Sequence, residues 1–433
     1  MMIKKLKNIG IFKLLLWFGL FNLIVFTAVV FYAYFHVEKP DAGREAFYAT
    51  SLQPVPDYEN IAIAFAGISA PSGADMIKHG RFVIDTTWQK PKEGEAKKII
   101  EAAGKLDFVG TADELECWIP STKPYTNEKC ANSERIKVLL AENSELLARY
   151  KNLYTMRSWE GISGNGQYVI NLNKLISAEV MLDLANDDAN SAYIKWRDNH
   201  LFISRVLKQD GTMIERAIFL VVDGISLASL ENILFKSPET GSTHFEELNS
   251  LLKANKLERY NVKGMLRADY IFATNHLFVI DKNQKILDEN YIKNRLYRFQ
   301  LDFLNRALMS PATFDNRYKE MNEKYEFGNN VFKYDWLNPL QSVLANLLIS
   351  GQASGFNLVK SMHSKDALIK LLNLSMHIRQ QKIATSDIQT FLNNAGSEYH
   401  NPFTNKPMQW DATRNVIYGE NPLTAEAQVE VRL

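Results

Sequence analysis

A histidine and two carboxylates stand close together in the stretch STHFEEL, which is the first place to look for metal chemistry. His244 is followed by Glu246 and Glu247, and imidazole and carboxylate groups are common zinc ligands. The structural alternative is a helix start, capped by Ser242 or Thr243, with the glutamates favoured in its first turn. No two of the eight histidines have the i, i+4 spacing of a zinc-peptidase helix. We therefore predict a capped helix here and no metal site.

One acidic residue interrupts an otherwise apolar stretch. Asp223 divides AIFLVVDGISLASL, residues 217–230, into two short halves, so this stretch fits the core of a soluble domain better than a membrane span. A buried carboxylate needs a partner or a shifted pKa. Arg197, Arg205 and Arg216 are candidates near in sequence. We predict a structural ion pair at Asp223, with an acid–base role as the alternative.

The chain has two cysteines, Cys117 and Cys130, separated by a polar segment with prolines. In an oxidising compartment an even cysteine count favours a disulfide. Free thiols and a zinc site are the alternatives. The zinc site needs two more ligands nearby, and no histidine lies between His79 and His200. We predict a Cys117–Cys130 disulfide that closes a surface loop.

The remaining motifs carry no catalytic signature. GISGNG at 161–166 is rich in glycine but lacks the Lys-Ser/Thr of a phosphate-binding loop, and G-x-S-x-G is absent. We therefore predict no catalytic residue, no cofactor and no metal ion. Whether the chain is an enzyme stays open at this point, and we favour a non-enzymatic role.

The positions of these residues depend on an apolar segment near the N-terminus. Residues 14–35 contain no charged side chain and are long enough for a helix to cross a membrane, which takes about 20 residues. Lys13 and Trp17 mark one end, and Tyr32 and Tyr34 mark the other, as expected at lipid headgroups. We predict a retained membrane anchor. A cleaved signal peptide and a core helix are the alternatives.

The charges around this segment predict its orientation. Four lysines and no acidic residue precede residue 14, so residues 1–13 should form a cytoplasmic tail and the bulk of the chain should be periplasmic. This places the protein in a bacterial inner membrane with lipid as its first partner. The whole chain carries 50 Lys and Arg against 49 Asp and Glu, and no basic stripe indicates a nucleic-acid partner.

Beyond the anchor the pattern is mainly helical. We predict a linker at 36–55, a small irregular or β region at 56–132, a helical domain at 133–395, and a C-terminal turn and hairpin at 396–433. Apolar residues recur with helical spacing in the segments 133–156, 171–188, 190–211 and 212–236, and again in the second half of the chain. Gly211 suits a helix C-terminus. Residues 256–296 are mixed, with strands expected. The fold class is therefore mainly α, with one transmembrane helix and minor β structure.

Two segments resemble known but uncharacterised families. In the tail, EYHNPFTNKPMQWDATRNVIYGENP (398–422) resembles the D-P-F-T-G-K-P-L motif of bacterial envelope proteins, with Asn401 for the Asp and Asn405 for the Gly. The front segment 56–80 and the helix containing LLARY (146–150) resemble membrane-anchored proteobacterial proteins. The matching front residues are Pro56, Asp57, Asn60, Gly67, Ala70, Pro71, Gly73, Asp75 and Gly80. The paired cysteines continue this similarity. It implies an association with type VI secretion in Acinetobacter-like bacteria, and it brings no catalytic residues.

Three functions follow as hypotheses. The first is a membrane-anchored periplasmic protein that positions or recruits an envelope complex, with the type VI secretion apparatus as the partner. The second is an envelope hydrolase whose residues converge only in space. The third is a periplasmic binding module for a small molecule or wall fragment, in a groove between helices.

Overall fold

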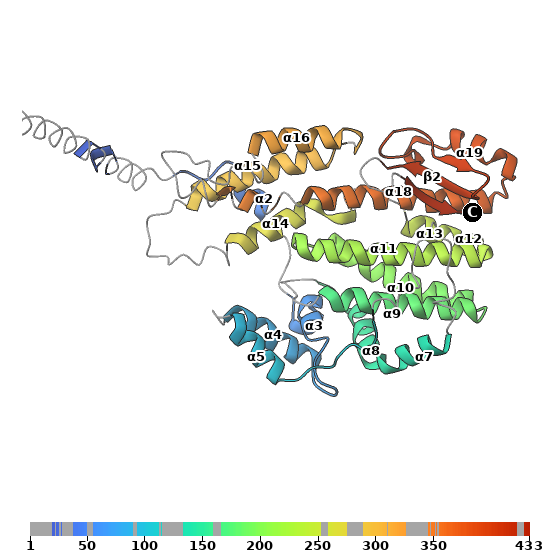
Figure 1. Ribbon diagram of the computed structural model, residues 1–433, viewed down its shortest axis with the longest axis horizontal. Helices are drawn as coiled ribbons and strands as arrows, with labels where there is room; N and C mark the ends of the chain where they lie inside the picture. The colour runs from blue at the N-terminus through green and yellow to red at the C-terminus, as the bar shows by residue number, and fades with distance from the viewer. Residues whose placement is uncertain are drawn as a thin grey trace, which may run out of the picture. The chain divides into compact units, whose positions relative to one another are not determined.

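The computed structural model describes a mainly helical protein (Figure 1). The described residues are 20–21, 23–25, 27, 38–49, 55–89, 93–111, 114, 133–158, 166–252, 259–274, 289–309, 311–325, 345–346, 348–350, 352, 355–421 and 428–433. They divide into two compact units, each built from separate stretches of the chain. The larger unit comprises Thr50–Asp269, Ala307–Asp315 and Gly355–Leu433, and the smaller unit comprises Met1–Ala49, Tyr270–Arg306 and Asn316–Ser354. The predicted boundaries at 132 and 395 therefore fall inside the larger unit.

The larger unit holds most of the helices. They are α3 (Ile61–Ala66), α4 (Met76–Gln89), α5 (Glu93–Ala102), α7 (Ser133–Glu142), α8 (Ser144–Asn152), α9 (Gly166–Ala185), α10 (Ala189–Lys208), α11 (Met213–Lys236), α12 (Pro238–Thr243), α13 (Phe245–Leu251), α18 (Gly355–Gln380) and α19 (Ile388–Asn394). The short 3-10 helices of this unit are η1 (Asp57–Glu59), η3 (Leu153–Thr155), η6 (Pro311–Thr313), η7 (Thr385–Asp387) and η8 (Ser397–Tyr399). Helix α14 (Val262–Phe272) begins in this unit, and its last three residues belong to the smaller one.

Helix α11 forms the centre of the larger unit. It packs against α9, α10 and α18, and these four helices run side by side in Figure 1. Contact on several sides explains why α11 is apolar nearly all round. Among the described residues it is the one helix long and apolar enough to cross a membrane, and 78% of its apolar window is buried. This agrees with the prediction that residues 217–230 belong to a core.

The start of α11 is fixed by a capping box. The Thr212 hydroxyl accepts a hydrogen bond from the Glu215 amide, and the Glu215 carboxylate accepts one from the Thr212 amide. Each side chain thus satisfies a backbone donor that the helix start leaves unpaired. The prediction of a helix end at Gly211 is wrong: α10 ends three residues earlier, at Lys208, because the connection to α11 uses residues 209–212.

The region 56–132 is not a β region where the structure describes it. Residues 55–89 and 93–111 hold η1, α3, α4 and α5, and their single β contact is a bridge between Asn60 and Ser158. Two glycines serve helix packing. A Cβ on Gly67 would lie 1.8 Å from the carbonyl oxygen of Met76, and one on Gly80 would lie 1.9 Å from that of Ile63. The glycines therefore allow close backbone contact between the end of α3 and α4.

An arginine on α8 holds the segment that joins α3 to α4. The Arg149 guanidinium donates to the carbonyl oxygens of Ile68, Ala70 and Pro71 at 3.0, 2.5 and 2.9 Å. It also pairs with Glu145 at 2.7 Å, and Glu145 accepts a hydrogen bond from the Ser72 hydroxyl at 2.7 Å. The LLARY helix and the front motif are thus parts of one structural contact.

Helices α7 and α8 replace the single helix predicted at 133–156. The break lies at Asn143, which is buried. Its side chain donates to the carbonyl of Val109 at 2.8 Å and accepts from the Val109 amide at 2.9 Å. The predicted apolar face is nevertheless correct, since Leu139 and Tyr150 are both buried.

The C-terminal segment forms a three-stranded antiparallel sheet in the order β1-β2-β3. The strands are β1 (Gln409–Asp411), β2 (Val416–Glu420) and β3 (Gln428–Arg432), with Trp410 opposite Ile417 and Ile417 opposite Val431. The predicted hairpin is confirmed, whereas β3 was not expected. The sheet packs on α18. Its residues Ile417 and Val431, together with Met408 just before β1, join the core formed by α10, α11 and α18.

Two asparagines explain the turn of the tail motif. Asn405 has a φ of +56°, which favours Gly or Asn, so it can replace the glycine of the motif. The Asn401 side chain accepts a hydrogen bond from the Phe403 amide at 2.9 Å and donates one to the Glu420 carbonyl at 2.9 Å. An aspartate could make only the first of these bonds when ionised. Asn401 therefore ties the turn to the end of β2.

The outer edge of β1 is covered by one side chain. Gln389 of α19 accepts a hydrogen bond from the Trp410 amide at 2.8 Å and donates one to the Met408 carbonyl at 3.3 Å. These are backbone groups that a neighbouring strand would otherwise pair. Unpaired edge groups invite association between chains, so Gln389 protects this edge.

The smaller unit contains α2 (Arg44–Tyr48), most of α15 (Glu289–Ala307) and most of α16 (Phe314–Tyr325). Residues 345–346, 348–350 and 352 are also helical. The expectation of strands at 256–296 is wrong in its described part, which is occupied by α14 and the start of α15. The predicted linker 36–55 is likewise structured over residues 38–49, because α2 and the residues before it are held by α15.

The contact between α3 and α4 leads to a prediction about stability. Gly67→Ala or Gly80→Ala should destabilise the larger unit by about 1–3 kcal/mol, because the added methyl group meets backbone that cannot move freely. Thermal unfolding of the detergent-solubilised full chain measures the effect. Gly211→Ala is the matched control, since its Cβ would lie 3.5 Å from the nearest other atom. Equal melting temperatures for all three variants and the wild type would contradict this account.

Candidate functional site

Residues 38–49, which directly follow the predicted anchor, are held against α15. We call this contact the α2–α15 clamp, made by Glu38–Ala49 with Asn290, Asn294, Arg298 and Gln300 of α15 and with Tyr270. Its centre is the fully buried Asn294. The Asn294 side chain donates to the Lys39 carbonyl at 2.7 Å and accepts from the Asp41 amide at 3.0 Å. One carboxamide therefore satisfies two backbone groups of a segment that has no regular secondary structure of its own.

Charged side chains reinforce the α2–α15 clamp. Arg298 binds both carboxylate oxygens of Asp41, at 2.6 and 2.8 Å, and reaches Glu38 at 3.3 Å. The hydrogen bond from Arg298 lowers the pKa of Asp41. Arg44 of α2 donates to Asn294 at 2.7 Å and is itself buried. Because Arg298 is exposed, its ion pairs add little stability, and the buried hydrogen bonds should dominate.

An aromatic cluster completes the clamp. The Tyr48 ring stacks on Tyr270 with a centroid distance of 3.5 Å and an interplanar angle of 7°. Phe47 meets the ring of Tyr297 edge-on at 5.4 Å. The Tyr48 hydroxyl donates to the fully buried Gln300 at 2.7 Å, and burial raises the pKa of Tyr48. This tyrosine therefore stays neutral, and its contact with α15 does not titrate near neutral pH.

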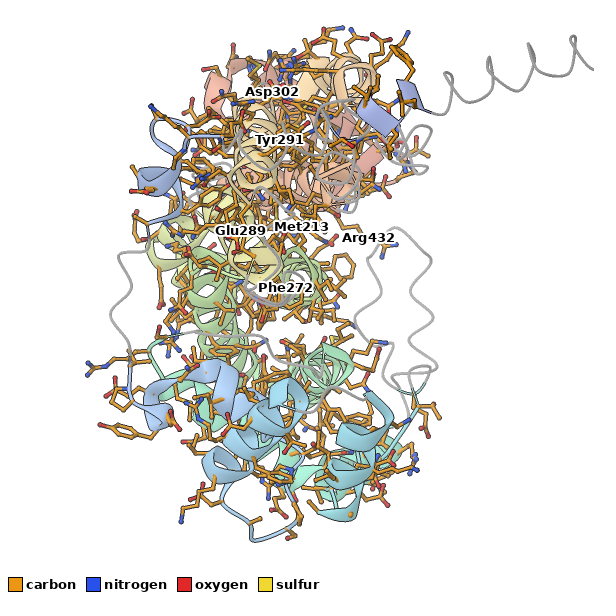
Figure 2. All side chains as sticks on the ribbon, turned by 90° about the vertical axis from the view of Figure 1, so that its left-hand side faces the viewer. Met213, Phe272, Glu289, Tyr291, Asp302 and Arg432 are labelled. Carbon is orange, nitrogen blue, oxygen red and sulfur yellow. The ribbon has the colours of Figure 1, made fainter. Side chains whose placement is uncertain are left out.

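The clamp is a structural contact between residues 38–49 and α15. It ties the chain directly after residue 37 to α15, the long helix of the smaller unit whose residues Tyr291 and Asp302 are labelled in Figure 2. A segment held by buried hydrogen bonds and stacked rings lacks the freedom of a flexible linker. Residues 38–49 are thereby fixed against α15.

The structure places Asp223 in a buried ion pair, as predicted, but with a different partner. Arg259 donates to Asp223 at 2.6 Å, and the Tyr260 hydroxyl donates to it at 3.3 Å. Asp223 is fully buried and Arg259 is nearly so. The partner is distant in sequence because the chain returns to α11 just before α14. The predicted ion pair at Asp223 is therefore present, with Arg259 as its partner.

The three arginines expected at Asp223 bind elsewhere. Arg197 pairs with Asp198 at 2.8 Å, and Arg205 donates to the Tyr154 carbonyl at 2.7 Å. Arg216 donates to the carbonyl of Leu207 at the end of α10 and to that of Gln209 in the connection to α11. Proximity in sequence did not predict the partner of Asp223, because the side chains of Arg197, Arg205 and Arg216 contact other parts of the protein.

Sequence reasoning missed the histidine beside this pair. His200 is fully buried, stacks on Trp196 at 5.0 Å, and has its Nε2 3.4 Å from the Arg259 guanidinium. Burial, aided by Arg259, lowers the pKa of His200 to about 3. It is therefore neutral at physiological pH. Its place on the apolar face of the predicted helix 190–211, four residues after a tryptophan, was the available signal for burial.

The STHFEEL cluster lies where α12 meets α13. Ser242 and Thr243 are the last residues of α12 and do not cap α13, so the predicted cap is wrong; His244 occupies the N-cap position and makes no capping side-chain bond. The expected early glutamates are present, with Glu246 and Glu247 in the first turn of α13.

A shallow surface pocket of about 330 Å³ lies at this junction, lined by residues 242–247 and Gln380. Within it, His244 stacks on Tyr193 with a centroid distance of 3.9 Å. Glu247 accepts a hydrogen bond from the Tyr193 hydroxyl at 2.8 Å and lies 3.7 Å from Arg197. The side chains of His244 and Glu247 thus already have protein partners. In the part of the chain that the structure describes, no three His, Cys, Asp or Glu side chains are grouped to hold a metal ion.

Several predicted features lie outside the described residues. These are the cysteines Cys117 and Cys130 and the anchor residues Lys13, Trp17, Tyr32 and Tyr34. Of the 161–166 loop, Gly166 alone is described, as the first residue of α9. Of the anchor, the described residues 20–21, 23–25 and 27 are helical.

The buried position of Asn294 leads to a prediction about local opening. Asn294→Ala should leave the Lys39 carbonyl and the Asp41 amide unpaired, which costs about 1–3 kcal/mol for a buried site. Trypsin cleavage after Arg44 in the detergent-solubilised chain should become at least about tenfold faster. Asn305→Ala, an exposed position on the same helix, is the control and should cleave like the wild type. Arg298→Ala should have a smaller effect than Asn294→Ala, and the reverse order would refute the role given to Asn294.

Comparisons of this chain with protein-family models, with curated proteins and with solved structures found no match.

Proposed function

We propose that this protein is a membrane-anchored, non-enzymatic positioning protein of the bacterial envelope. In this proposal residues 14–35 cross the inner membrane, residues 1–13 remain in the cytoplasm, and the helical units lie in the periplasm. The observation that carries the proposal is the α2–α15 clamp. A protein that merely needed to stay near a membrane could use a flexible linker, whereas this chain uses buried hydrogen bonds directly after the proposed anchor.

The described part of the N-terminal segment supports the anchor. Its helical residues expose large apolar side chains: Leu20, Phe21, Leu23, Ile24 and Val25 are between 43% and 64% exposed. The Thr27 hydroxyl donates to the Leu23 carbonyl at 2.7 Å, which satisfies this polar group within the helix. A contiguous apolar surface of this kind is unfavourable in water and is suited to lipid.

The partner in this proposal is an envelope protein complex. We name the type VI secretion apparatus, because the front segment 56–80 resembles proteins that accompany it. In this proposal the clamp would give the smaller unit a set direction with respect to the membrane.

A binding module is the second candidate, and one observation favours it. The pocket at His244 is open to solvent and presents carboxylate, hydroxyl and amide groups. It is small for a ligand pocket, which commonly encloses about 300–1,000 Å³, and two of its lining side chains are engaged by Tyr193 or Arg197. We therefore rank this function below positioning.

The first experiment tests the anchor and its orientation. The intact chain should stay with membranes after alkaline carbonate washing and should be released by detergent. Alkaline phosphatase fused after residue 433 should be active, because the enzyme needs an oxidising periplasm for its disulfides. An intact chain among freely soluble proteins, or an inactive fusion at normal expression, would contradict this proposal.

The second experiment tests positioning itself. Asn294→Ala should reduce co-purification of secretion-apparatus components from solubilised membranes while the variant remains membrane-bound at the wild-type level. Asn305→Ala should co-purify the same components as the wild type. If both variants retain the complex equally, the clamp is not required for positioning.

A further inference from the structure

A buried carboxyl group lies where the chain passes from the larger unit into the smaller one. Asp269 of α14 is the last residue of the larger unit in this stretch, and Tyr270 is the first of the smaller. The Asp269 Oδ1 atom accepts a hydrogen bond at 3.1 Å from the amide of Met213, the first residue of α11, which is labelled in Figure 2. Its Oδ2 atom is buried and has no hydrogen-bond partner among the described residues.

Ionised Asp269 would be a second buried negative charge beside Glu215, and the basic side chains nearby already have other hydrogen-bond partners. Glu215 of α11 is 4% exposed, and its carboxylate already serves the capping box. Arg216 of the same turn is 2% exposed, and its guanidinium donates to the backbone carbonyls of Leu207 and Gln209. In the connection before α11, Asp210 is bound by Arg267 of α14 at 2.5 and 2.6 Å. Arg267 is therefore paired with Asp210, whereas Arg216 keeps its positive charge, and its buried Nε has no hydrogen-bond partner among the described residues.

These surroundings favour the neutral form of Asp269. The Met213 amide and Arg216 favour the ionised form, whereas burial and Glu215 oppose it. Burial is the largest of these effects and raises the pKa of Asp269 to about 7. A carboxyl group with its ordinary pKa would be ionised throughout the neutral range, so this one is unusual in titrating there.

We propose that Asp269 is a proton-controlled latch between α14 and the first turn of α11. With the carboxyl group neutral, α14 stays docked and the α11 start is covered. When the proton leaves to solvent, a negative charge beside Glu215 remains buried unless α14 moves away. This inference rests on the Asp269 contacts alone and does not depend on the membrane anchor.

The latch lies next to the α2–α15 clamp along the chain. The residue after Asp269 is Tyr270, whose ring stacks on Tyr48 in that clamp. Acidification would stiffen the docking of α14 on the first turn of α11, and rising pH would loosen it.

The direction of the effect follows from proton binding. The folded state binds the Asp269 proton up to about pH 7, whereas an opened state releases it near pH 4. Between these values the folded state holds more protons, so stability of the docked form falls as pH rises. Above about pH 7 both states are ionised and the dependence levels off.

Hydrogen–deuterium exchange of the full chain in detergent tests this inference. After correction for intrinsic exchange rates, the opening constant at the start of α11 should rise more than about tenfold between about pH 5 and pH 7.5 in the wild type. Asp269→Asn keeps an oxygen for the Met213 amide and cannot ionise, so its opening constant should not change with pH. Asp188→Asn is the control, because Asp188 caps α10 through the Ser191 amide and is exposed; this variant should keep the wild-type pH dependence.

Two outcomes would overturn the latch. The first is an opening constant that changes with pH equally in the wild type and in Asp269→Asn. The second is loss of the pH dependence at the α11 start in Asp188→Asn as well, which would show that the effect is not specific to Asp269.

Discussion

The carboxamide of Asn294 is fully enclosed, and its two polar ends must both be satisfied inside the protein. They are satisfied by backbone groups of Lys39 and Asp41, which fixes a short extended segment in one register. The contacts of Tyr48, of Arg44 and of the aromatic rings around α2 depend on this register. The proposed role as a positioning protein depends on this constraint, because it holds residues 38–49 against α15.

Periodicity in the sequence predicted much of the larger unit. Apolar residues at helical spacing located α9, α10 and α11, and turn residues before alternating apolar residues located β1 and β2. The remainder depended on long-range contact. Helix α2 has five residues and is held by side chains about 250 positions away, so no local signal could identify it. The sequence predicted that Asp223 is a buried ion-pair residue. It did not predict the partner, because Arg259 is distant in sequence and meets Asp223 only in the folded structure.

Glycines and asparagines account for some of the wrong predictions, and they also explain several local structures. The glycines at 67 and 80 suggested turns and short strands, yet they allow two helices to touch. The motif residues that resemble envelope families have structural roles in this chain. Asn60 caps α3, Asp75 accepts from the first amides of α4, and Arg149 holds the loop between these helices. In this chain these residues therefore form structural contacts around α3, α4 and α8.

The central claim is that residues 38–49 form an ordered clamp and are not a flexible linker. Hydrogen–deuterium exchange of the full chain in lipid nanodiscs tests this most directly, by following peptides that cover these residues. The account predicts exchange at least about 100-fold slower than that of an unstructured chain, with protection at the Asp41 amide. Exchange of the whole segment at the rate of an unstructured peptide would contradict it.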